Sequence, residues 1–230
     1  MNAETKIAAE AETKEDLYYM VHKGMRFADV RMLTAIGQTD PADDAAVDAL
    51  LAKLDEHLEI SRSHLEHENR EIHTALESRC PGGSDHAADD HGEHEESFEE
   101  LRRLAEDVAS ATADRPAKLR RLYQRFALFV AHDLEHMHEE ETGLMPLIEK
   151  NFSNDEIVAI HQRITKNIPP LKLARFLRLM LGGASPAERV AMITGMQMEM
   201  PAEVFGGIME AITGTKWKTG DWAALERAVC

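Results

Sequence analysis

The sequence predicts an all-α protein, an up-down-up-down four-helix bundle followed by a C-terminal extension of short helices. Composition is the first reason, because the chain is rich in Ala, Leu, Glu and Arg and only 5% of its 230 residues are aromatic. Periodicity is the second, because apolar residues recur every three to four positions along four long stretches. The connections between these stretches are mostly short, as antiparallel neighbours require.

The first two helices are marked by their boundaries. Thr13 and Asp16 resemble a capping box, and a helical period then continues over about residues 15–36, up to a glycine. Asp40 is the expected N-cap of a second, longer helix over about residues 41–78, which stops before a Pro-Gly-Gly sequence.

A polar loop at about residues 79–90 separates these helices from the next two. The third helix is predicted from the apolar period that runs from His91 to Val108. Asp114, followed by a proline in the first turn, begins the fourth helix, which ends near Asn151.

The chain divides into residues 1–152, the bundle, and residues 153–230, the extension. The first part holds 34 acidic and 17 basic residues, a net charge of −17, whereas the second holds 8 and 9, a net charge of +1. Prolines in the extension stand where short helices would begin, at Pro170, Pro186 and Pro201. Its many Met and Leu residues predict that it packs on the bundle or on a second subunit, which would make the protein a homodimer.

The net charge, the N-terminal residues and the cysteine content narrow the range of possible partners, locations and metal sites. A formal net charge of −16 argues against nucleic acid and against an anionic membrane surface as partners. The first thirty residues lack the apolar stretch of a signal peptide, so we expect a cytoplasmic protein. Cys80 and Cys230 form neither a disulfide framework nor a thiolate metal site, and the sequence assigns them no role.

The chemistry lies in polar residues that interrupt the apolar stripes. Two His-x-x-x-Glu pairs, His64 with Glu68 and His136 with Glu140, each place an imidazole and a carboxylate on one helix face. His22 and His94 occupy interior positions on the other two helices. Burying such groups without compensation would cost several kcal/mol per charge, on the order of the stability of the whole domain.

A metal pair would compensate for this burial. Four imidazoles and two carboxylates that can bridge suit iron or manganese better than zinc, which prefers four tight ligands, or calcium, which prefers oxygen. Metal sites in helical bundles are built from inward Glu and His residues on facing helices.

These residues give the chain a resemblance to the hemerythrin-like (HHE cation-binding) family over about residues 15–152. The matching stretches are YYMVHKGMR, HLEHENREIHTAL, DHGEHEESFEELRRL and HMHEEETGLMPLIEKNF. The resemblance implies two non-haem iron ions, bridged by carboxylates and by an oxo or hydroxo group. It implies as metal ligands His22, His64, Glu68, His94, His136 and Glu140, with the two glutamates bridging.

The sequence departs from the oxygen-carrying members of that family. Phe98 stands where they have a second histidine on the third helix, and Glu140 follows His136 at four positions, whereas they have an aspartate at five. These departures argue against reversible oxygen carriage and bring the chain nearer to the bacterial and sensor-type members.

Several histidines leave alternatives open. His91 competes with His94, since both lie on the inward stripe of the third helix, and the symmetry of the spacing favours His94. His57 is expected to be buried behind the ligands. The expected solvated histidines are His67, His73 and His138.

Two functions follow. In the first, the protein binds or reacts with a small oxidant (oxygen, nitric oxide or peroxide) at the iron pair, reached through a channel of apolar side chains. In the second, it is a non-catalytic iron- or oxygen-responsive module whose metal occupancy controls a partner surface. Whether it is an enzyme is left undecided, and no catalytic residue is assigned.

Overall fold

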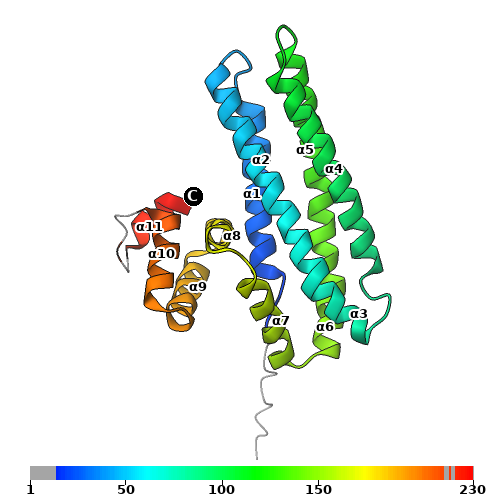
Figure 1. Ribbon diagram of the computed structural model, residues 1–230, viewed down its shortest axis with the longest axis vertical. Helices are drawn as coiled ribbons and strands as arrows, with labels where there is room; N and C mark the ends of the chain where they lie inside the picture. The colour runs from blue at the N-terminus through cyan, green and yellow to red at the C-terminus, as the bar shows by residue number, and fades with distance from the viewer. Residues whose placement is uncertain (1–13, 215–217, 219–220, 230) are drawn as a thin grey trace, which may run out of the picture.

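The computed structural model describes residues 14–214, 218 and 221–229, and within these ranges every regular element is a helix (Figure 1). The all-α prediction is therefore confirmed for this part of the chain. The α-helices are α1 (Tyr19–Gln38), α2 (Asp44–His67), α3 (Thr74–Arg79), α4 (Asp85–Ala109), α5 (Arg115–Glu139), α6 (Met145–Asn151), α7 (Asn154–Lys166), α8 (Pro170–Gly183), α9 (Pro186–Glu199), α10 (Ala202–Thr213) and α11 (Trp222–Val229). Two π-helical turns, η1 (Glu68–His73) and η2 (Glu140–Leu144), join α2 to α3 and α5 to α6.

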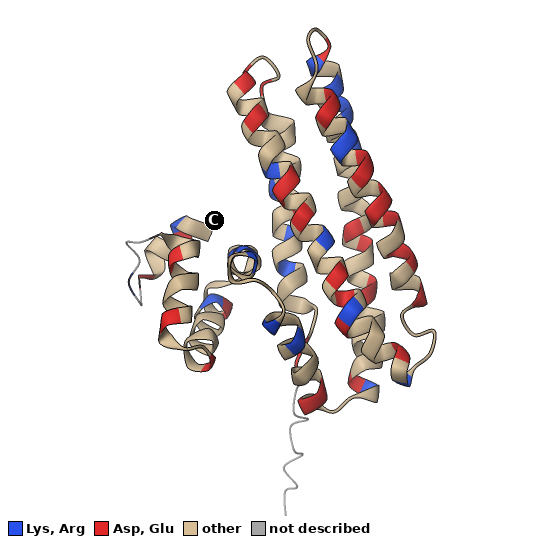
Figure 2. Ribbon diagram, viewed as in Figure 1, with Lys and Arg blue, Asp and Glu red and all other residues tan. Residues whose placement is uncertain are grey.

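Four long helical segments lie side by side, and we call them the long-helix unit, residues 19–151 (Figure 1). In this unit α1 contacts α2 and α5, and α4 contacts the same two helices from the other side. The acidic residues are spread along these segments (Figure 2).

The helix boundaries differ from the predicted ones at three points. The first helix begins at Tyr19, after Asp16 has accepted hydrogen bonds from two backbone N–H groups, while Thr13 lies outside the described residues. The second is capped by Asp43, whose side chain accepts from the N–H of Ala46, and not by Asp40. The predicted loop at 79–90 is too long, because α4 begins at Asp85, an acidic first-turn residue that suits the positive end of a helix.

Both π-helical turns begin at the glutamate of a His-x-x-x-Glu pair. A π-helical turn takes up about one extra residue, which rotates all following side chains by roughly 100° relative to an α-helix. The two long helices predicted as continuous are therefore each interrupted at the predicted metal site, and the side chains that follow point in a different direction.

The C-terminal unit, residues 154–229, has an apolar core of its own, in which α8, α9, α10 and α11 meet. It also packs closely on the long-helix unit where α8 crosses α1. A Cβ atom added to Gly24 would lie 2.8 Å from the backbone nitrogen of Met180, and one added to Gly183 would lie 2.5 Å from the carbonyl oxygen of Lys23. The absence of side chains at these glycines allows the two backbones to approach.

Apolar clusters enclose the polar interior of the long-helix unit. A large cluster fills the half nearest the α1–α2 and α4–α5 connections, and a second, which includes Ile72, Leu144 and Ile157, closes the opposite end. A third is formed where Phe176 of α8 meets Met25 and Met137. Among the described helices, none has both the length and the apolar character that crossing a membrane requires.

Candidate metal centre

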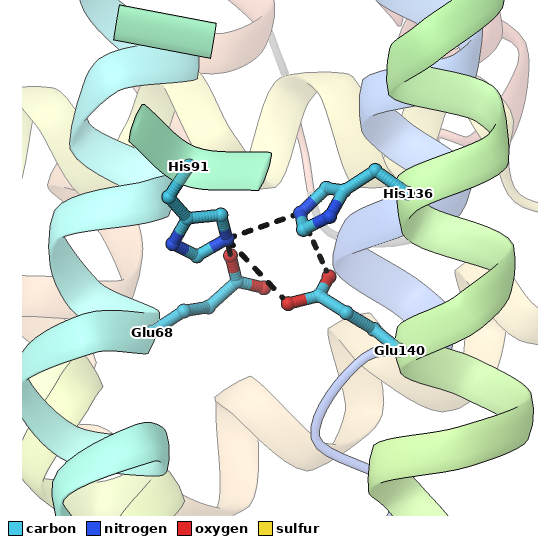
Figure 3. A group of neighbouring side chains, drawn as sticks. All are labelled: Glu68, His91, His136 and Glu140. Carbon is cyan, nitrogen blue, oxygen red and sulfur yellow. Dashed lines mark hydrogen bonds and ion pairs between the residues drawn. The ribbon is translucent and has the colours of Figure 1, made fainter. Parts of the chain in front are cut away.

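Two overlapping groups of buried side chains face one another between the long helices. Glu68, His91, His136 and Glu140 form the first, and Figure 3 shows these four side chains pointing toward a common centre. His22 and His64, again with Glu68, form the second. Within each group the candidate ligand atoms lie within 4.8 Å of one another, so each group could hold a metal ion. Glu68 belongs to both.

The two glutamates span the two groups. Oε1 of Glu68 lies 3.3 Å from Nε2 of His64 and 3.4 Å from Nε2 of His22, whereas its Oε2 lies 3.6 Å from Nε2 of His91. Oε2 of Glu140 lies 3.2 Å from Nε2 of His22 and 3.4 Å from Nε2 of His136, and its Oε1 lies 3.6 Å from Nε2 of His91. Glu68 therefore directs one oxygen to each group, whereas Oε2 of Glu140 lies between a histidine of each.

These distances are too long for good hydrogen bonds, but they suit two atoms that bind the same metal ion. Oε2 of Glu68, both carboxylate oxygens of Glu140 and Nε2 of His64 are buried without a hydrogen-bond partner. Buried polar atoms without partners are rare in native proteins because each costs about 1–3 kcal/mol. Two ligand atoms about 2.1 Å from one metal, at angles of 90–110°, are roughly 3.0–3.4 Å apart, close to the separations found here.

Oxygen atoms behind the imidazoles orient them inward. Nδ1 of His22 donates to Glu141 at 3.1 Å, and Arg26 holds that carboxylate with both terminal nitrogens. Nδ1 of His91 donates to the Asn69 side-chain oxygen at 2.8 Å. Because the acceptor is an oxygen in each case, Nδ1 carries a hydrogen, and Nε2 is the ring nitrogen that faces the interior.

His136 is held in the same way, since its Nδ1 lies 3.3 Å from Oδ2 of Asp90. Its Nε2 lies 3.0 Å from Nε2 of His91, too close for two hydrogen-free nitrogens unless a cation or a shared proton lies between them. Oxygen acceptors on the outer nitrogen are the usual support of metal-binding histidines.

The electrostatics of the groups favour a cation. Burial raises the pKa of Glu68, and the neighbouring Glu140 carboxylate raises it further. Burial acts in the same direction on Glu140, but the surrounding imidazoles, His22 first, outweigh it and hold the pKa of Glu140 well below its ordinary value. Burial and the charge of His22 lower the pKa of His64 to about 3, so this imidazole is neutral at neutral pH, the form that binds metal.

The structure brings together five of the six residues predicted as ligands, and it places His94 apart from them. His94 donates from Nδ1 to the backbone oxygen of Asp90 and directs Nε2 to Asp133 at 3.2 Å. His91, the alternative on the same helix, occupies the inner position. The two side chains are three residues apart, so the helical period alone could not separate them.

The expectation that His67 and His73 are solvated is wrong. Both are buried, and Nε2 of His73 lies 3.7 Å from Oε1 of Glu140. On an uninterrupted α-helix, His73 would lie about 180° from His64, but η1 falls between them and turns His73 back toward the interior. His138 is exposed as expected.

Sequence reasoning missed two buried carboxylates, Asp29 and Asp133. Nε2 of His57 lies 3.0 Å from Oδ1 of Asp29, so His57 is buried beside a carboxylate behind the candidate ligands, as expected. Burial and the neighbouring Asp133 carboxylate raise the pKa of Asp29 well above its ordinary value. The signal was present, because Asp133 falls on the same inward stripe as His136.

An open cavity of about 650 Å³ reaches the candidate metal centre between α4 and α5. His94 and His136 form its inner wall, and its remaining lining is mostly charged, including Glu93, Glu135 and Glu139. This differs from the apolar channel expected for a small oxidant. Cys80 is half-buried at the end of α3, and Cys230 lies outside the described residues.

Comparison of the chain with protein-family models, with curated proteins and with solved structures finds no match in any of the three.

Proposed function

We propose that this chain is a hemerythrin-like protein, an up-down-up-down four-helix bundle that binds two iron ions and reacts with a small oxidant such as oxygen, nitric oxide or peroxide. The observation that carries the proposal is the position of Glu68, whose two oxygens face two different groups of histidines. A carboxylate shared in this way is what a bridged pair of metal ions requires.

Each ion has its own set of ligands in this proposal. His22 and His64 would hold one ion with Oε1 of Glu68, and His91 and His136 would hold the other. Glu140 would bridge them beside Glu68. His91 thus replaces His94 as the ligand from the third long helix, because its Nε2 faces both glutamates. His73 adds a nitrogen near Glu140 on the second side.

Iron in such a pair supplies a redox-active centre with positions open to a small ligand. The protein's own part is to fix the imidazoles through Glu141, Asn69 and Asp90 and to limit the access of bulk water. The apolar clusters close both ends of the polar interior, whereas the cavity between α4 and α5 stays open. Buried charges interact strongly in the resulting low dielectric.

Metal analysis tests the proposal. After anaerobic loading with ferrous iron and removal of excess, we expect about two iron ions per chain and, on oxidation, the absorption of an oxo-bridged diferric pair. Turnover with peroxide and nitric oxide would then show which oxidant reacts. A content near zero, or a single zinc ion, would overturn the proposal.

One observation favours the second candidate function, an iron- or oxygen-responsive module. His22 and Gly24 lie on the same helix, so a candidate ligand and the tight contact with α8 are two residues apart. A change in metal occupancy that shifts α1 would therefore change the contact between α1 and the C-terminal unit. Limited proteolysis of that unit with and without iron separates the two candidates, and sedimentation shows whether it forms a homodimer.

A further inference from the structure

A third group of candidate ligands lies at the surface, at the mouth of the cavity between α4 and α5. Nε2 of His86 lies 3.1 Å from Oε2 of Glu139, and its Nδ1 lies 3.6 Å from Oδ1 of Asp90. These three side chains offer ligand atoms within 4.8 Å of one another. His86 is 73% exposed, whereas the two carboxylates are half-buried.

Asp90 connects this surface group to the candidate metal centre. Its Oδ1 faces His86, and its Oδ2 lies 3.3 Å from Nδ1 of His136. The same cavity is lined by His86 at its mouth and by His136 at its inner wall. A cation held at the surface would therefore be separated from the buried groups by a single side chain.

The lining of the cavity suits a cation better than a neutral diatomic molecule. Glu93, Glu135 and Glu139 contribute carboxylates, and Asp90 lies among them. The carboxylates of Asp90 and Glu139 lie beside both ring nitrogens of His86, so negative charge surrounds this point. Charged clefts concentrate ions of the opposite sign and speed their association.

We propose that His86, Asp90 and Glu139 form a loading site, which captures a divalent metal ion from solvent and passes it to the buried groups beside His136. The passage to the buried groups rests on the proposed function, whereas capture at the surface does not. Three protein ligands at an exposed position leave the remaining coordination positions to water, so binding is weaker than at the buried groups. Weak binding is what a transfer site needs, because the ion must leave it.

Loading kinetics test the transfer step. Metal-free protein is mixed anaerobically with ferrous iron, and incorporation is followed by quenching with a chelator and measuring the protein-bound iron. We expect His86→Asn with Glu139→Gln to slow loading on the order of tenfold while the final iron content is unchanged. His132→Asn with Glu93→Gln is the matched control, because both residues line the same cavity outside the trio. Equal loading rates in the two double variants would overturn the proposal.

Capture is tested separately with Mn²⁺, whose free ion is counted by electron paramagnetic resonance. In the full chain carrying Glu68→Gln and Glu140→Gln, we expect one weak Mn²⁺ site that disappears on adding His86→Asn. If that background fails to fold, the same titration of the wild-type chain and of His86→Asn should differ by one weak site. No difference would overturn capture.

The two sets of results distinguish the two proposals. A weak Mn²⁺ site that depends on His86, in a protein whose buried groups never retain iron, would remove the proposed function and leave the surface site standing. Two retained irons that load at the wild-type rate without His86 would remove the loading site and leave the proposed function standing.

Discussion

The interior of the long-helix unit is apolar in one half and polar in the other, although the same four segments build both halves. Toward the α1–α2 and α4–α5 connections the interior is an apolar cluster that includes Leu54, Leu122 and Phe126. Toward the other end it holds buried imidazoles and carboxylates, several of them without hydrogen-bond partners. Burial stabilises the first half, whereas it destabilises the second half unless a bound ion compensates.

This difference separates the residues that stabilise the fold from those that carry chemistry. Apolar burial is unaffected by metal, but ligand groups contribute to stability only when an ion binds the folded state. Substitutions in the two halves should therefore respond differently to the presence of iron, and this response is measurable as a change in the free energy of unfolding.

The largest effect is expected in the apolar half. Leu54 is fully buried, and Leu54→Ala should lower the free energy of unfolding by about 3–5 kcal/mol, because it removes apolar contacts and leaves a cavity. Denaturant unfolding with and without iron measures this loss, which we expect to be the same in both conditions. A loss that appears only with iron would show that this half is not independent of the metal.

A smaller effect with the opposite dependence is expected for Glu68→Ala. At an iron concentration of about ten times the dissociation constant, each bound ion adds roughly 1.4 kcal/mol, so the two ions that Glu68 would bridge add about 3 kcal/mol, and this increment should vanish in the variant. Without iron, the variant should lose little, because the removed side chain is a buried carboxyl with an unpartnered oxygen. Glu66→Ala, two residues away on an exposed face, is the control that keeps the increment. Similar behaviour of both variants would contradict the assignment of Glu68.

Sequence patterns predicted the apolar half better than the polar half. The stripes of large apolar residues mark helix faces directly, and the predicted all-helical character is confirmed. The polar half depends on information that a period of 3.6 residues does not hold. The turn η1 rotates His73 inward, and the choice between His91 and His94 depends on their partners, Asn69 and Asp133, which come from other segments.

Buried Asp and Glu residues are hard to predict from the sequence for a related reason. The long-helix unit is strongly acidic, so most of its Asp and Glu residues are solvated, and residue type alone does not mark a buried one such as Asp29. Its place on one stripe with Met25 and Met32 indicates burial, but only tertiary packing sets it against His57 and Asp133. The predicted division at residue 152 and the predicted homodimer stay predictions.

The pH dependence of the metal-free protein tests the buried histidines. Burial lowers the pKa of His57 to about 4, from its ordinary 6.5. Between these two values the unfolded chain binds a proton that the folded chain does not, so stability is present above pH 6.5 and is lost as the pH falls toward 4. His57→Gln should remove this part of the loss, so that the slope of stability against pH in this range falls by up to one proton, about 1.4 kcal/mol per pH unit.

Unfolding at a series of pH values measures that slope. His132→Gln, at an exposed histidine, should keep the wild-type slope. If His57→Gln also keeps it, His57 takes up its proton in the folded state, and the imidazole is less shielded than its burial indicates.

The smallest effect concerns the attachment of the C-terminal unit beside the polar half. Gly24→Ala should destabilise the protein by about 1–2 kcal/mol, because the added Cβ would meet the α8 backbone and neither backbone can move aside cheaply. Gly195→Ala on α9 is the matched control, since nothing lies within 4 Å of its added Cβ. In an unobstructed helix the same change is favourable by about 1 kcal/mol, so the two variants should differ in sign. Thermal melts with proteolysis of the C-terminal unit provide the measurement, and Gly24→Ala should speed cleavage within residues 154–229. If both variants were stabilised equally, α8 would not be held against α1, and the C-terminal unit would not shield the helix that carries His22.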